Sequence, residues 1–256
     1  MKKILLLSTL IAAPITTIQA QQQIEVAQIW NGTFRTNQLN ALNTLHTKNQ
    51  YSVLDYNRNT KTFTIDAFDF TTLEKVQTLF STADFPEIKE ISDYSINKTD
   101  DKILIATNSN PIYRHSFTSV YYLFDIASKS LIKISENAIQ EPLLNKNGSK
   151  IAYAFEKNLY VFDVATKKTT QITKDGKKNA IINGITDWVY EEEFAFVRAF
   201  DWNADGTKLA YIKFDESDVP VFSMDIYGED LYPQQQVFKY PKAGENNSKV
   251  SLHLYD

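Results

Sequence analysis

The sequence contains two kinds of short internal repeat, and these restrict the fold more than any other feature. The segment FDIASK at Phe124–Lys129 recurs as FDVATK at Phe162–Lys167, and NGSKIAY at Asn147–Tyr153 recurs as DGTKLAY at Asp205–Tyr211. In each case a polar turn leads into a strand, and a following strand ends at Asp before a Lys-bearing turn. Several strands in a repeat of about 40 residues are typical of β-propeller blades, since one blade alone cannot bury its faces. A β-sandwich with similar hairpins is the alternative.

Short aromatic and β-branched segments separated by polar turns continue from about residue 50 to the end of the chain. The abundance of aromatic residues, 16 Phe and 14 Tyr against 7 Gly, also favours β-structure. Two segments have helical apolar spacing, Asn37–Leu45 and Leu73–Phe80, and we expect short helices there. We predict strands at Tyr51–Tyr56, Thr62–Asp66, Ile103–Thr107, Val120–Ile126, Ile151–Phe155, Leu159–Val164, Leu209–Phe214 and Val250–Tyr255.

The predicted fold class is all-β, an incomplete β-propeller over residues 50–256. Blades of about 40–50 residues allow only four or five in this length, fewer than the larger ring that we expect. The sequence also stops inside the predicted strand at Val250–Tyr255. We therefore expect a truncated piece of a longer protein. Its residues 21–49 are expected to form an N-terminal segment that contains a short helix.

The first twenty residues have the pattern of a secretory signal peptide. Lys2 and Lys3 precede an apolar run from Ile4 to Pro14, and small and polar residues follow to Ala20. The run is too short to cross a bilayer, which takes about 20 residues. The prediction is a signal peptide at residues 1–20, export to the periplasm or the extracellular space, and no membrane span after cleavage. A buried N-terminal helix is the alternative.

Composition excludes several classes of function. The chain has 27 basic and 31 acidic side chains, a formal charge of −4, whereas nucleic-acid binding requires a concentrated basic surface. Without Cys there is no disulfide, Cys–zinc or thiol-nucleophile chemistry, and the three His residues lack zinc-like spacing. We expect no metal, no organic cofactor and no nucleic-acid partner.

Two stretches could carry chemistry. In Gly184–Phe194 three adjacent carboxylates, Glu191, Glu192 and Glu193, lie among aromatic residues. Two of them could bind a substrate ammonium if the backbone forms a helical turn or an irregular bend, since neighbours in a strand point to opposite faces. The alternative is an exposed acidic turn or helix end. Arg114, flanked by aromatic residues, could direct its guanidinium fork at a carbonyl or carboxylate oxygen, or be a surface Arg paired with Glu192 or Glu193.

These stretches resemble the dipeptidyl peptidase IV family of prolyl oligopeptidase-type serine peptidases, in a bacterial form. The resemblance spans roughly residues 21 to 256 and is most specific in the double-glutamate segment. The segments that carry it are Arg114–Thr118, Asn183–Glu193, Asp201–Trp202, Asp205–Tyr211, Phe214–Pro220 and Tyr240–Gly244.

The resemblance implies an exported exopeptidase that removes dipeptides from free N-termini with Pro or Ala in second position. It implies that Glu192 and Glu193 bind the substrate ammonium and that Arg114 binds a carbonyl oxygen. Glu191 would be a supporting residue that does not touch substrate, with Tyr190 and Trp188 as further supporting residues.

The resemblance also implies an N-terminal propeller followed by a C-terminal α/β-hydrolase domain that is absent from this chain. No Gly-x-Ser-x-Gly motif occurs in the sequence, so we expect the catalytic residues to lie beyond Asp256 and this chain alone to be inactive. A homodimer, formed partly through an extension at about Val221–Asn246, is a further implication. One departure is Phe196, an aromatic residue where a smaller one is expected and where the first substrate side chain could be contacted.

Two other functions stay open. One is a non-catalytic secreted propeller that binds a peptide or protein partner, which has no reason to combine Arg114 with Glu192 and Glu193. The other is a related exported peptidase with altered substrate choice, such as an endopeptidase or a different aminopeptidase, in which the acidic pair would be absent.

Overall fold

The computed structural model describes residues 23–36 and 39–256, in two compact units, Met1–Leu39 and Asn40–Asp256. The predicted signal peptide lies outside the described residues. In the first unit a five-residue helix, α1 (Val26–Trp30), begins with a capping box between Glu25 and Gln28. This helix lies within residues 21–49 but not at Asn37–Leu45, where the apolar spacing predicted one. None of the described helices is long and apolar enough to cross a membrane.

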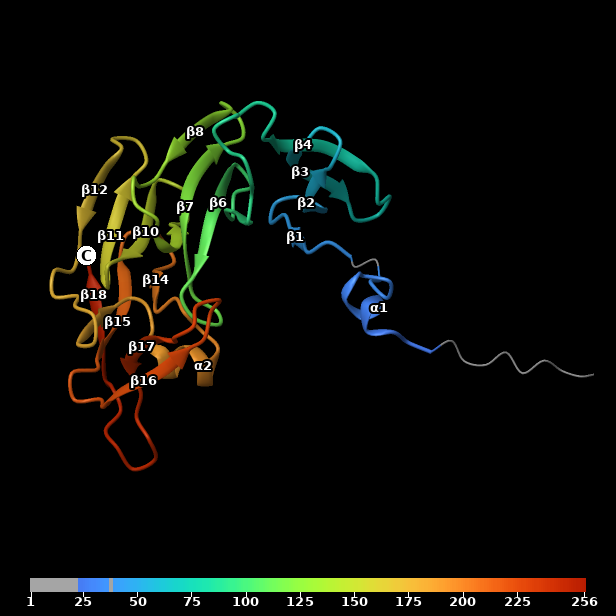
Figure 1. Ribbon diagram of the computed structural model, residues 1–256. Helices are drawn as coiled ribbons and strands as arrows, with labels where there is room; N and C mark the ends of the chain where they lie inside the picture. The colour runs from blue at the N-terminus through green and yellow to red at the C-terminus, as the bar shows by residue number, and fades with distance from the viewer. Residues whose placement is uncertain (1–22, 37–38) are drawn as a thin grey trace, which may run out of the picture. The chain divides into compact units, whose positions relative to one another are not determined.

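The second unit is built from antiparallel sheets arranged as successive propeller blades (Figure 1). The first sheet contains β1 (Leu42–Thr44), β2 (Gln50–Asn57), β3 (Thr62–Asp69) and β4 (Lys75–Ser81). The second contains β5 (Asp93–Ile96), β6 (Lys102–Pro111), β7 (Phe117–Asp125) and β8 (Ser130–Lys133). The third contains β9 (Gln140–Leu144), β10 (Lys150–Phe155), β11 (Asn158–Asp163) and β12 (Lys168–Gln171).

The fourth sheet has a different construction. Its central strand β15 (Leu209–Asp215) pairs with β18 (Lys249–Tyr255) on one edge. On the other edge it pairs with two short strands, β13 (Ile181–Asn183) and β14 (Phe200–Trp202), which are separated by helix α2 (Trp188–Phe194). Between β15 and β18 the chain forms a separate hairpin of β16 (Val221–Ile226) and β17 (Gln234–Lys239). We call this hairpin the arm. The all-β, incomplete propeller predicted from the repeats is thus confirmed.

The repeated sequences form the same turns in different blades. Asp125 Oδ1 accepts hydrogen bonds from the backbone and hydroxyl of Ser128, and Asp163 Oδ1 accepts the equivalent pair from Thr166. Asn147 and Asp205 cap their turns in a matching way, each followed by a glycine with positive φ. The repeats therefore record turn chemistry that connects the strands of each blade.

The two helices predicted from apolar spacing are both wrong. Within Asn37–Leu45, Leu42–Thr44 forms β1, so the first sheet begins before the predicted residue 50. Leu73–Phe80 contributes most of β4, because Leu79 and Phe80 are buried against the neighbouring sheet. In both segments pairing and burial against other strands override a short helical pattern.

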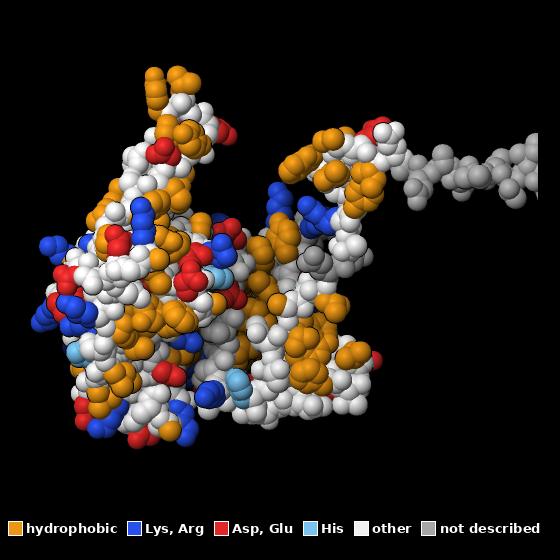
Figure 2. Space-filling model, turned by 90° about the horizontal axis from the view of Figure 1, so that it is seen from below, with side chains coloured by type: hydrophobic (Ala, Val, Ile, Leu, Met, Phe, Trp, Pro, Cys, Tyr) orange, Lys and Arg blue, Asp and Glu red, His pale blue; other side chains and the backbone are white. Residues whose placement is uncertain are grey.

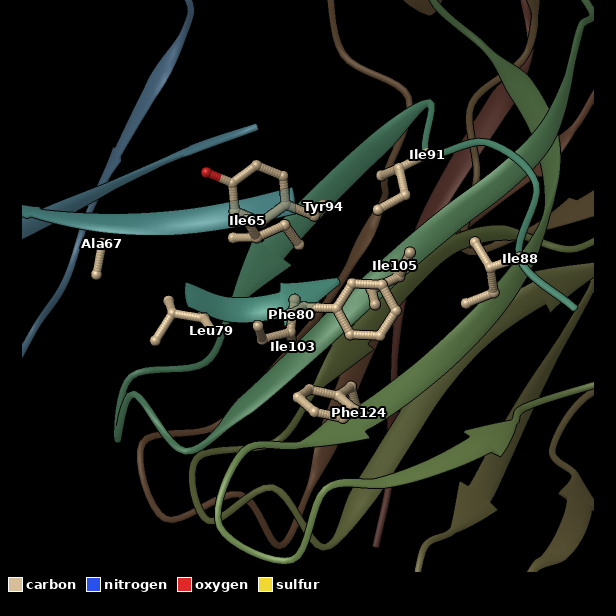
Figure 3. Close-up of a cluster of buried hydrophobic side chains, with 10 residues drawn as sticks. All are labelled: Ile65, Ala67, Leu79, Phe80, Ile88, Ile91, Tyr94, Ile103, Ile105 and Phe124. Carbon is tan, nitrogen blue, oxygen red and sulfur yellow. The ribbon is translucent and has the colours of Figure 1, made fainter. Parts of the chain in front are cut away.

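The core consists of three hydrophobic clusters, each between adjacent sheets. The first joins side chains of β3 and β4 to those of β5, β6 and β7, with Phe80 set edge-on to Phe124 at 4.9 Å between ring centroids (Figure 3). The third sheet packs against the second in another cluster and against the fourth in the last. This sheet-by-sheet burial fixes the position of the fourth sheet and its inserted helix.

Candidate functional site

Helix α2 places the three glutamates on one short helical segment inserted into the inner edge of the fourth sheet. Asp187 caps its N-terminus by accepting a hydrogen bond from the backbone of Tyr190 at 2.9 Å. Ala195 ends it in the left-handed conformation, with φ of 55°. Convergence of two neighbouring glutamates requires a helical turn or an irregular bend, because neighbours in a straight strand point to opposite faces. Helix α2 meets this requirement.

Gly184 directs the chain from β13 into this insertion. Its φ is +75°, and a Cβ atom there would lie only 2.5 Å from Leu159 Cδ2. Its N–H donates to Ile212 O and its C=O accepts from the N–H of Ala199, so the residue is also held in the sheet. Only glycine fits a position that combines a left-handed backbone with so close an approach.

The three carboxylates lie in different environments. Glu191 is 2% exposed, Glu192 is half-buried and Glu193 is exposed. Glu192 and Glu193 lie in the last turn of the helix, where negative charge opposes the helix dipole. Helix stability therefore does not explain these two side chains.

Glu191 connects the acidic helix to the loop between β6 and β7. Its Oε1 accepts hydrogen bonds from the backbone N–H groups of His115 at 2.9 Å and Ser116 at 2.7 Å. These charge-assisted bonds satisfy two loop donors and hold the residues that follow Arg114 against α2. Glu191 is thus placed to support the other two glutamates.

Arg114 lies beside the acidic helix. Its Nε is 3.2 Å from Glu192 Oε2, and its side chain is 72% exposed while that of Glu192 is 13% exposed. Among the described residues this is the one ion pair that Arg114 makes, and it involves Nε, not the terminal nitrogens of the guanidinium. The structure therefore brings Arg114, Glu191 and Glu192 together, with Glu193 adjacent on the same helix.

The aromatic residues of the segment attach α2 to its surroundings. Tyr190 packs against Phe214 at 5.0 Å between ring centroids and against Phe196 at 6.2 Å. Phe196 is half-buried and belongs to the packing of this core, while Phe194 beside Glu193 is 63% exposed. Trp188 turns the other way and packs against the arm, which lies next to α2 in Figure 1.

A cavity of about 700 Å³, which was not predicted from the sequence, adjoins the N-terminal end of α2. Tyr113, Lys157, Asp187 and Glu216 contribute to its walls. Burial raises the pKa of the Glu216 carboxyl and lowers the pKa of the Lys157 ammonium. The pKa of the Tyr113 hydroxyl is raised by burial and then by the nearby carboxylates of Glu216, Glu191 and Asp187. In the sequence, only the position of Tyr113 next to Arg114 could have indicated that Tyr113 lies near this site.

Among the described residues, no group of His, Asp and Glu side chains is arranged to hold a metal ion. The site consists instead of the exposed carboxylate of Glu193, the partly buried carboxylate of Glu192, one guanidinium, and the buried carboxylate of Glu191 that joins their segments. Such a set can bind a group that carries both a positive charge and a carbonyl oxygen, as the N-terminus of a peptide does.

Fold and site together define a β-propeller protein in which an acidic helix lies beside a loop that bears an arginine. Comparison with known proteins gives the family: residues 97–256 match the "Dipeptidyl peptidase IV (DPP IV) N-terminal region". The chain belongs to this family, which confirms the resemblance seen in its motifs.

Individual relatives agree. The chain is 32% identical over 168 residues to mouse (Mus musculus) prolyl endopeptidase FAP and 38% identical over 170 residues to cat (Felis catus) dipeptidyl peptidase 4. The crystal structure of Porphyromonas gingivalis dipeptidyl peptidase 4 superimposes with a TM-score of 0.83 at 33% identity, covering 92% of this chain and 34% of that one. The matched region spans 22% of the length of each of the two mammalian relatives. The chain is thus homologous to the N-terminal propeller region of serine dipeptidyl peptidases.

Proposed function

We propose that this chain is the substrate-recognition part of an exported serine exopeptidase that removes X-Pro and X-Ala dipeptides from free N-termini. The observation that carries the proposal is the contact between α2 and the loop between β6 and β7, which contains Arg114. Glu191 holds the loop, and Arg114 lies 3.2 Å from Glu192. A non-catalytic binding propeller has no need of this combination.

The chemistry follows from the charges. A peptide's α-ammonium has three donors and one positive charge, which the carboxylates of Glu192 and Glu193 can share. Arg114 keeps donors free for a carbonyl oxygen of the same substrate. An ammonium held at a fixed distance from the nucleophile leaves room for two residues, so the acidic pair determines the length of the product.

The residues that cleave the peptide bond belong, in this proposal, to a C-terminal hydrolase domain beyond residue 256. The small share of each relative that the chain covers supports this assignment, and the described propeller alone is expected to be inactive. Complementation of this chain by a separately expressed hydrolase domain would measure the dependence. Activity of the isolated chain would contradict the assignment.

Export and dimer formation are further parts of the proposal. N-terminal sequencing of protein from the periplasm or the medium should find a start near Gln21, and an uncleaved start at Met1 would contradict export. Exposed apolar residues on the arm support a homodimer, and light scattering at a monomer mass would argue against it. These residues are Val221, Met224, Ile226, Tyr227, Leu231, Tyr232 and Val237. Figure 2 shows hydrophobic side chains at the end of a projection from the larger unit.

The name of one relative, prolyl endopeptidase FAP, suggests a second candidate function, which is endopeptidase activity. An endopeptidase would cleave after an internal proline in a peptide with a blocked N-terminus. Mass analysis of products from blocked and free peptides separates the two activities, because the exopeptidase releases only dipeptides from free ends.

The substitution Arg114→Lys in the full-length protein is expected to lower kcat/KM for dipeptide substrates by roughly 10- to 100-fold. Lysine keeps the charge but loses the planar fork, and a hydrogen bond to a charged group is worth about 1.5–3 kcal/mol. The measurement is steady-state kinetics on Gly-Pro-p-nitroanilide. Arg58→Lys, in the exposed turn between β2 and β3, is the matched control. Kinetics of Arg114→Lys equal to those of the control would refute the role of the fork.

A further inference from the structure

The base of the arm contacts both segments that form the recognition site. Phe238, near the end of β17, is 5% exposed. Its ring centroid lies 5.4 Å from that of Trp188, the first residue of α2, and 6.3 Å from that of Tyr113. Tyr113 immediately precedes Arg114. A single side chain thus touches the helix of the glutamates and the loop of the arginine.

Other contacts fix the arm base in this position. Lys239 Nζ donates hydrogen bonds to the carbonyl oxygens of Val219 at 2.6 Å and Ser217 at 3.2 Å, which closes the arm against the end of β15. Tyr240 N donates to Pro220 O at 3.0 Å, and its ring lies edge-on to Trp188 at 5.1 Å. Past the arm, Ser248 donates a hydrogen bond to Asp187, the N-cap of α2.

The loop and the helix are therefore held together from two sides. On one side Glu191 accepts the two backbone bonds of the loop. On the other side Phe238 packs between Tyr113 and Trp188, and neither of these residues stacks directly on the other. Aromatic contacts at such distances are directional, so they restrict the relative orientation of the two segments.

We propose that Phe238 is a positioning residue for the substrate-binding site. By bridging Tyr113 and Trp188 it sets the separation between the Arg114 guanidinium and the carboxylates of Glu192 and Glu193. It touches no substrate, and its effect is on how well the bound dipeptide is held. The inference rests on the proposed function, since it assumes that these three groups bind the substrate.

The arm supplies its own control. Phe222 in β16 packs against Phe238 at 5.8 Å and Tyr240 at 5.6 Å, so it belongs to the same aromatic group. No aromatic contact joins it to Tyr113 or Trp188 among the described residues. Phe222→Leu and Phe238→Leu both remove a ring from the arm base, but only the second removes a ring from the recognition site.

The experiment compares these variants in the full-length protein, with Gly-Pro-p-nitroanilide as the substrate. Phe238→Leu is expected to raise KM about tenfold while kcat changes less than about threefold, because misplaced binding groups weaken the hold on the substrate. Phe222→Leu should leave KM within about twofold. Phe238→Tyr should restore the parent KM, since the ring is kept and the adjoining cavity can accept a hydroxyl.

Two further measurements keep the test decisive. Phe238→Met retains volume without a ring and serves if Phe238→Leu does not fold. The rate of labelling by a fluorophosphonate reports the nucleophile independently of the amine site, and it should be the same in all variants. Equal KM values for the Phe238 and Phe222 variants would overturn the inference, and so would a fall in kcat and labelling rate without a change in KM. In either case the proposed function would still stand, provided that the parent protein cleaves the dipeptide substrate. A parent protein that fails to cleave the dipeptide would remove both.

Discussion

Replacing Glu192 or Glu193 by Ala in the full-length protein should lower kcat/KM for free-amine dipeptide substrates by roughly 10² to 10³. Loss of one partner from a desolvated charge pair costs about 2–5 kcal/mol, and each 1.36 kcal/mol corresponds to about a factor of ten. In the complex the substrate ammonium would lose one of its two carboxylates while remaining shielded from water. Steady-state kinetics on Gly-Pro-p-nitroanilide measures the effect.

Glu136→Ala provides the matched control for this prediction. Glu136 is 88% exposed and pairs with Lys133 at the end of β8, away from the recognition site. Its removal should change kcat/KM by less than about twofold, as expected for an exposed ion pair. If the Glu192 and Glu193 variants stay within twofold of the parent as well, neither residue anchors the ammonium.

Glu191→Ala should have the second large effect, and it should act on both stability and binding. Glu191 is 2% exposed and satisfies the N–H groups of His115 and Ser116. Its removal leaves two donors without a partner in a nearly closed space, at a cost of about 1–3 kcal/mol for each. The loop that carries Arg114 would lose its attachment to α2, so KM should rise together with the loss of stability.

The variant Glu191→Gln separates these contributions. The amide oxygen of Gln can accept the same two hydrogen bonds, although without the added strength of a negative charge. We expect its melting temperature and KM to lie between those of the parent and of Glu191→Ala, as measured by calorimetry and kinetics. A parent-like Glu191→Ala variant would show that the loop does not depend on this carboxylate.

The sequence was sufficient to predict β2, β3, β6, β7, β10, β11, β15 and β18, because the signals of these strands are local. The other strands lie at sheet edges or in the arm and were not predicted. Alternating apolar residues, together with Asx turns such as those at Asp125 and Asp163, repeat in each blade and lead to the same hairpin. Local patterns failed at Leu73–Phe80, where helical spacing of apolar residues predicted a helix and the structure has strand β4. The burial of Leu79 and Phe80 in β4 depends on Phe124 and the rest of the next sheet, which a local pattern does not contain.

The recognition site divides in the same way. Adjacent glutamates identified the acidic segment, and the pairing of Arg114 with Glu192 was one of two alternatives that the residues allowed. The hydrogen bonds that the backbone N–H groups of His115 and Ser116 donate to Glu191 could not be predicted, because they join positions about 75 residues apart. The role proposed for Phe238 could not be predicted for the same reason, because its ring contacts Tyr113 and Trp188 only after the arm folds back.

The central claim is that this propeller recognises the free amine of a peptide for a dipeptidyl peptidase. Its most direct test uses the product of the whole reading frame and compares Gly-Pro-p-nitroanilide with its N-acetyl derivative. Acetylation removes the positive charge that Glu192 and Glu193 are proposed to bind and leaves the scissile bond unchanged. We expect cleavage of the free substrate and a kcat/KM at least about 10³ lower for the acetylated one, in line with the loss of a charged anchor. Equal cleavage of both substrates, or of neither, would contradict the claim.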